Sequence, residues 1–109
     1  MNKFKITLLA FATLALTSSA AYALDDAART ALMKDFKCLK CHDATEEKDA
    51  PSYHKIAAKY KGKADAASKL YTHLTTGPMV KIDDNEEHHA KLKAPDADIK
   101  AVIAWILAQ

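Results

Sequence analysis

The 109-residue chain has few of the residues that usually interrupt or cross-link a fold, with two glycines, three prolines and two cysteines. Gly62 and Gly77 are the glycines, and no repeat, low-complexity tract or linker divides the chain, so we predict one compact domain. A structural zinc site would need a second pair of ligands beyond two cysteines. The sequence also lacks a run that alternates polar and apolar residues as a half-buried strand does.

The N-terminal segment has the features of a secretory signal peptide. Met1–Lys5 is basic, residues 6–16 are apolar apart from threonines, and Ala21-Tyr22-Ala23 is a small-x-small cleavage signal. The apolar run is shorter than the roughly 20 residues that cross a bilayer. We therefore predict a signal peptide over residues 1–23, a mature domain over residues 24–109 and export to the periplasm.

The charge balance gives no support to nucleic-acid binding or membrane binding. The net charge of +2 comes from Lys3 and Lys5 in the predicted signal peptide, which leaves 14 basic and 14 acidic side chains in the mature domain. Any docking preference must therefore come from local patches of charge.

Helical periodicity covers most of the predicted mature domain. Four helices are expected, at residues 25–36, 52–61, 64–75 and 95–107. Gly62 and Gly77 follow the second and third of these, where a glycine commonly ends a helix. The last helix is the clearest, because a proline and two aspartates open it and Trp105 widens its apolar face. The sequence predicts an all-α fold.

The motif Cys38-Leu39-Lys40-Cys41-His42 indicates covalent attachment of a c-type haem. Each cysteine can add to a haem vinyl group to form a thioether, and His42 can then bind the iron from the proximal side. A thioredoxin-type dithiol would require a strand-helix setting that the neighbouring sequence lacks. A plain disulfide would leave His42 unexplained. We predict one haem c per chain, held by Cys38 and Cys41.

The chain resembles the class I cytochromes c, in particular the small bacterial periplasmic kind that shuttles single electrons. The resemblance rests on residues 32–34, 38–42, 50–60, 62–77 and 96–107. It implies an all-α class I cytochrome c fold, with about four helices around one covalently bound haem. It also implies a monomer that exchanges electrons with redox partner proteins, such as other cytochromes, reductases or oxidases. Carriers of this kind also occur in iron-oxidising pathways, as in the MtoD type.

Pro51 has a specific role in the family pattern. There, the carbonyl of the proline at this position accepts a hydrogen bond from the second ring nitrogen of the proximal histidine, which orients the imidazole and makes it a better donor to iron. A proline that merely opens a helix is the alternative interpretation.

The sixth iron ligand is where the sequence departs from the family, which usually supplies a methionine between the third and last helices. Met79 follows Pro78, but the residue sixteen positions before Trp105, where that methionine usually lies, is His89. We predict His89 as the distal ligand, with Met79 and His88 as alternatives. Ligation by His42 and His89 would give a lower reduction potential than ligation by histidine and methionine.

Two classes of function remain open at this stage. A one-electron carrier needs no acid-base machinery, and the sequence shows no catalytic residues. A haem-based gas sensor or small haem enzyme would need a displaceable distal ligand. His54 and His73 are expected to face solvent. Lysines near the motif or the distal loop could form a basic ring around the haem edge, and they are Lys37, Lys40, Lys81, Lys91 and Lys93. Acidic residues on either side could instead make the docking face mixed or acidic, and they are Glu46, Glu47, Asp49, Asp83, Asp84, Glu86 and Glu87.

Overall fold

The computed structural model describes residues 24–109. The predicted signal peptide therefore lies outside the described residues. The described part of the chain contains the helices α1 (Asp26–Asp35), α2 (Cys38–Cys41), α3 (Tyr53–Tyr60), α4 (Ala66–Thr76) and α5 (Asp96–Leu107), and the strands β1 (Met79–Ile82) and β2 (Asn85–His88). No helix within it is long and apolar enough to cross a membrane.

Local signals in the sequence set the helix ends. The Asp25 carboxylate accepts a hydrogen bond from the backbone N–H of Ala28 at 2.7 Å, and the Ser52 hydroxyl accepts one from the N–H of Lys55 at 3.1 Å. These two residues cap α1 and α3. Helix α4 ends at Gly77, whose φ of +59° places it in the left-handed region that glycine adopts without strain.

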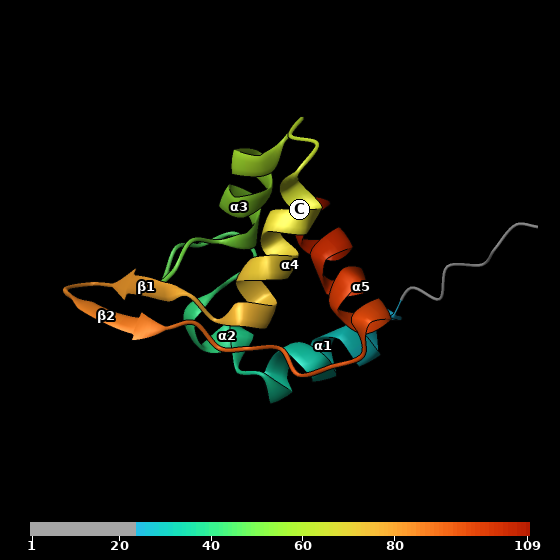
Figure 1. The fold of residues 1–109 in the computed structure, drawn as a ribbon, viewed down its shortest axis with the longest axis horizontal. Helices are drawn as coiled ribbons and strands as arrows, with labels where there is room; N and C mark the ends of the chain where they lie inside the picture. The colour runs from blue at the N-terminus through green and yellow to red at the C-terminus, as the bar shows by residue number, and fades with distance from the viewer. Residues whose placement is uncertain (1–23) are drawn as a thin grey trace, which may run out of the picture.

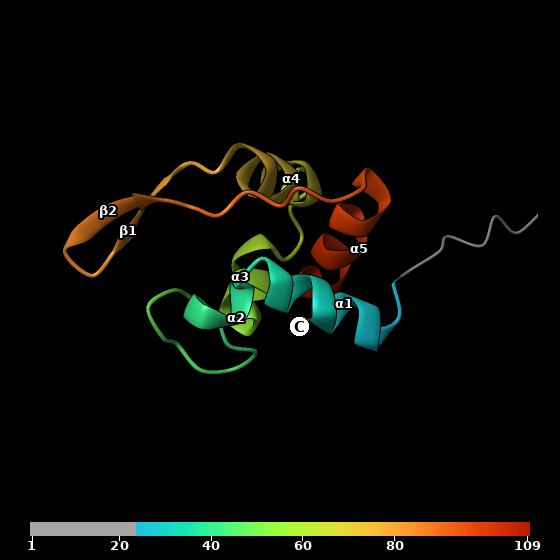
Figure 2. The same cartoon turned by 90° about the horizontal axis from the view of Figure 1, so that it is seen from below.

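Helix α5 is at the centre of the packing, because it contacts α1, α3 and α4 (Figures 1 and 2). Its side chains Ile99, Val102, Ile103 and Ile106 are at most 5% exposed. They pack with Met33 of α1 and with Leu70 and Leu74 of α4 in one hydrophobic cluster. The four predicted helices are all present, and this cluster holds them around the site.

The expectation that no strand would appear was wrong. Strands β1 and β2 form an antiparallel hairpin in which Ile82 pairs with Asn85, and the hairpin projects beyond the helices in Figures 1 and 2. Asp83 adopts a φ of +53° in the turn, a conformation that aspartate tolerates better than most residues. Val80 and Ile82 are partly buried while Met79 and Lys81 are exposed. The alternation is therefore present in β1, but four residues are too few to stand out in the sequence.

Candidate haem site

The two cysteines lie on the single turn of α2. Because they are three residues apart in a helix, their side chains share one face. Both thiols are free and partly buried, and both residues line the same cavity as His42. Burial raises the pKa of the Cys38 thiol.

His42 follows α2 and is fixed by two contacts. Its Nδ1–H donates a hydrogen bond to the carbonyl oxygen of Pro51 at 2.6 Å. Its ring stacks on Tyr53 with 5.2 Å between the ring centres, and Tyr53 in turn meets Trp105 edge to face at 5.3 Å. Burial lowers the pKa of His42, partly offset by the Pro51 bond. Burial thus favours the neutral ring, and the bond to Pro51 uses Nδ1 and leaves Nε2 as the nitrogen that could bind a metal.

A cavity of about 800 Å³ opens in front of these residues. This volume falls within the range of about 300–1,000 Å³ that is typical of ligand and cofactor sites. The proximal side of the cavity is formed by α2, His42 and α3. The opposite, distal side is formed by α4, the hairpin and the segment that leads to α5. Its apolar lining includes Phe36, Ile56, Tyr60, Leu70, Leu74, Val80, Ile82, Leu92, Val102 and Ile106.

His89 lies across the cavity from His42. The centres of the two rings are 6.2 Å apart and the ring planes are 51° from parallel. Two imidazoles on opposite sides of one metal ion, each with a nitrogen about 2 Å from it, place their ring centres about 6 Å apart. The residues present therefore fit a haem with two histidine ligands.

The other distal candidates are placed differently. Met79 is 52% exposed and does not line the cavity. His88 also lines the cavity, and its Nδ1–H donates to the carbonyl oxygen of Gly77 at 3.0 Å, which leaves its Nε2 free, but the residue is exposed. The Nδ1–H of His89 donates to the carbonyl oxygen of Ala90 at 2.8 Å, which leaves its Nε2 free. His89 differs from both in that its ring is partly buried and its centre lies 6.2 Å from that of His42.

His73 is a cavity residue that the sequence analysis placed wrongly in solvent. It is partly buried on α4, and its ring centre lies 4.5 Å from that of His89. Burial lowers its pKa. The signal was available, because His73 lies three residues after the buried Leu70, a spacing that places two side chains on the same face of a helix. A histidine on an apolar helix face points inward with its neighbours.

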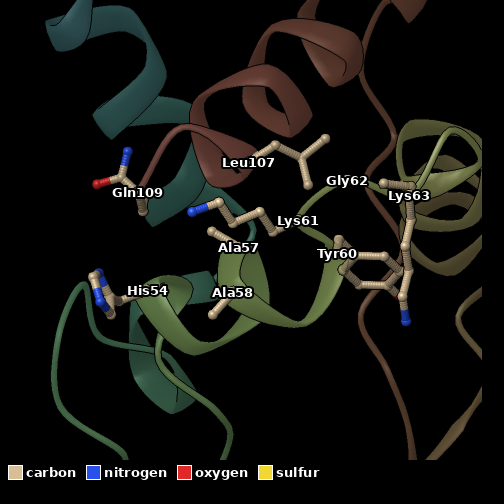
Figure 3. A pocket seen from close by; sticks show the side chains of 10 residues that line it. His54, Ala57, Ala58, Tyr60, Lys61, Gly62, Lys63, Leu107 and Gln109 are labelled. Atoms are coloured by element: carbon tan, nitrogen blue, oxygen red, sulfur yellow. The ribbon is translucent and has the colours of Figure 1, made fainter.

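His54 is exposed, as expected. It lines a second hollow of about 480 Å³ between α3 and the C-terminal end of α5 (Figure 3). Tyr60 and Leu107 also line this hollow, which contains no cysteine. It therefore offers no means of covalent haem attachment.

The rim of the haem cavity is basic. Of the lysines expected there, Lys37, Lys40 and Lys81 line the cavity, whereas Lys91 and Lys93 do not. Two rim lysines that the sequence analysis missed are Lys55 and Lys59, and the one acidic lining residue is Glu87. The missed lysines lie on α3, which was not recognised as a wall of the cavity.

The helices surround a cavity that is lined by the two cysteines and His42. This arrangement defines a c-type cytochrome. Within residues 24–109, no cluster of three or more histidine, cysteine or acidic side chains could hold a bare metal ion. Iron that the haem ring already holds requires only axial ligands from the protein. The chain belongs to the cytochrome c family, whose sequence model matches residues 20–109.

Individual relatives agree with this assignment. Cytochrome c2 of Rubrivivax gelatinosus is 37% identical over 73 residues, which cover 64% of this chain and 84% of that protein. The class 1 cytochrome MtoD of Sideroxydans lithotrophicus has a similar structure, with a TM-score of 0.74 and 45% identity over 79% of this chain and 97% of that one. Cytochrome c552 of Nitrosomonas europaea has a TM-score of 0.60 and 32% identity, covering 72% of this chain and 96% of that one. The class I cytochrome c fold predicted from the sequence is confirmed.

Proposed function

We propose that the protein is a periplasmic one-electron carrier with a single haem c. Cys38 and Cys41 would form the thioether bonds, and His42 and His89 would be the axial ligands. The observation that carries this proposal is that the imidazole rings of His42 and His89 both line the cavity, with their centres 6.2 Å apart. Family membership supports the electron-transfer role.

The haem supplies an iron that gains and loses one electron, and the protein residues tune this exchange. The carbonyl oxygens of Pro51 and Ala90 accept hydrogen bonds from the Nδ1–H groups of His42 and His89, so Nε2 of each imidazole would be the nitrogen that binds iron. Two imidazoles stabilise ferric iron more than an imidazole and a thioether do. The reduction potential should therefore lie below that of relatives with a methionine ligand.

A carrier fits the site better than a gas sensor or a small haem enzyme. The side of the cavity opposite His42 already holds His89, so an external ligand would first have to displace an imidazole.

The cellular context of the proposal rests on the N-terminal sequence and on the cavity rim. Residues 1–23 have the basic, apolar and cleavage regions of a signal peptide, which supports export. The basic rim suits encounter with an acidic surface on a partner cytochrome, reductase or oxidase. We propose that the mature protein works as a diffusible monomer.

Near-infrared spectra of the ferric holoprotein test the ligand assignment. We expect no sulfur-to-iron charge-transfer band in the wild type, and an unchanged low-spin spectrum for Met79→Ala. His89→Ala should become high spin and bind carbon monoxide rapidly in the reduced state. A charge-transfer band that disappears in Met79→Ala and persists in His89→Ala would show that methionine is the ligand and refute the proposal.

A further inference from the structure

His73 touches the proposed distal ligand ring to ring. The two ring centres are 4.5 Å apart and the planes meet at 61°, which is an edge-to-face contact. His73 lies on α4 beside the buried Leu74. The backbone N–H of Leu92 donates to the carbonyl oxygen of Leu74 at 2.8 Å, so the segment after His89 is tied to the same helix, and it passes the C-terminal end of α4 in Figure 1.

In addition to this ring contact, His89 makes hydrogen bonds with the backbone. Its N–H donates to the carbonyl oxygen of Pro78 at 2.8 Å, and its Nδ1–H donates to that of Ala90. The first bond places the main chain, and the second selects the tautomer. Ala90 is the next residue, so this bond moves with the His89 segment and does not tie the ring to the helices. The ring of His73 does tie the His89 ring to the helices, because His73 lies on α4 and the buried leucines of α4 hold that helix in the core.

We propose that His73 is a positioning residue for the distal ligand, an inference that rests on the proposed function of His89. The edge-to-face contact holds the plane of the His89 ring and resists the rotation by which His89 would leave the iron. His73 thereby slows the replacement of His89 by external ligands and keeps the protein an electron carrier. It does not itself bind the iron.

The size of the effect follows from the kind of contact. Edge-to-face aromatic pairs contribute beyond the area they bury, and the loss of one such pair corresponds to a change of about two- to tenfold in a rate or an equilibrium. His73→Ala should therefore speed cyanide binding to the ferric protein by about two- to tenfold. His73→Phe retains an aromatic edge and should remain close to the wild type.

The test combines cyanide-binding kinetics with electron paramagnetic resonance of the ferric holoproteins. The resonance of low-spin ferric haem depends on the orientation of the axial imidazole planes, so it reports the ring and not general stability. His54→Ala is the matched control, because His54 is an exposed histidine that does not line the haem cavity. Where His73→Ala does not retain haem, His73→Leu replaces it with the same expected result.

The inference is supported when His73→Ala speeds cyanide binding and shifts the resonance while His73→Phe and His54→Ala do neither. It is overturned when His73→Ala matches the wild type in both measurements, or when His73→Phe changes as much as His73→Ala. His89→Ala tests the underlying function separately. If His89→Ala retains the wild-type low-spin spectrum, then the ligand assignment fails, whatever the variants at His73 show.

Discussion

Replacing Gly77 with alanine should disturb the distal side of the haem site, whereas the same change at Gly62 should not. Both glycines have a left-handed backbone, with φ of +59° and +74°. A Cβ atom added at Gly62 would meet nothing within 4 Å. At Gly77 it would lie 2.5 Å from the carbonyl oxygen of His89 and 2.8 Å from Cγ of Lys91. Gly62→Ala therefore measures backbone strain alone, and Gly77→Ala measures strain together with a collision.

The two costs can be separated. A residue other than glycine in the left-handed region costs about 1–2 kcal/mol. Alanine also restricts the unfolded chain, which offsets about 0.4–1 kcal/mol of that cost. Gly62→Ala should therefore lower the free energy of unfolding by about 1 kcal/mol. The collision at Gly77 involves a backbone oxygen that can move only with the His89 segment, and overpacking of this kind adds about 1–3 kcal/mol.

Denaturant unfolding of the ferric holoproteins checks these values, with Gly77→Ala expected to lose about 2–4 kcal/mol in total. Because the displaced oxygen belongs to His89, Gly77→Ala should also bind cyanide faster than the wild type, while Gly62→Ala should not. Equal losses of stability in the two variants would refute the reasoning. So would a destabilised Gly77→Ala protein whose cyanide binding is unchanged.

Two further predictions concern charge. Oδ2 of Asp43 accepts hydrogen bonds from the N–H groups of Glu46 and Thr45, both at 3.0 Å, which hold the pKa of this carboxyl below its usual range. A carboxyl whose pKa is lower in the folded state than in the unfolded state stabilises the fold above the unfolded pKa of about 4. This stabilisation is lost as the pH falls through the folded-state pKa. The stability of Asp43→Asn should therefore decline less steeply on acidification, and equal slopes in denaturant titrations would contradict this. Lys40→Glu on the cavity rim should slow reduction of ferricyanide by about two- to tenfold at low ionic strength and less at high salt. Lys34→Glu on α1, where the residue does not line the cavity, should have a smaller effect.

The helices were predictable from the sequence because each carries strong local signals. Apolar residues at helical spacing, Asp25 before α1, Ser52 before α3 and Gly77 after α4 all act within a few residues of where they lie. The position of His89 could also be predicted, because it was counted from Trp105 on a well-defined helix. Its role in ligation stays a prediction that the ligand variants will test.

Features that depend on distant contacts were missed. The β hairpin has little apolar patterning, since every residue of β2 is exposed, and its pairing depends on the turn at Asp83. The contributions of Lys55 and Lys59 to the rim likewise depend on how α3 is placed beside α2. Each depends on tertiary packing, which periodicity within one segment does not specify.

The hairpin also resolves the apparent conflict between Met79 and His89. The two residues are ten positions apart in the sequence, but Met79 pairs with His88 in the hairpin register, and the N–H of His89 bonds to the carbonyl of Pro78. The intervening chain folds back on itself, so both candidates lie at the base of the hairpin. There Met79 is exposed and His89 lines the cavity. The hairpin therefore lengthens the distal loop without carrying its last residue away from the haem site, and changes at the turn, near Asp84, should leave the haem spectrum unaltered.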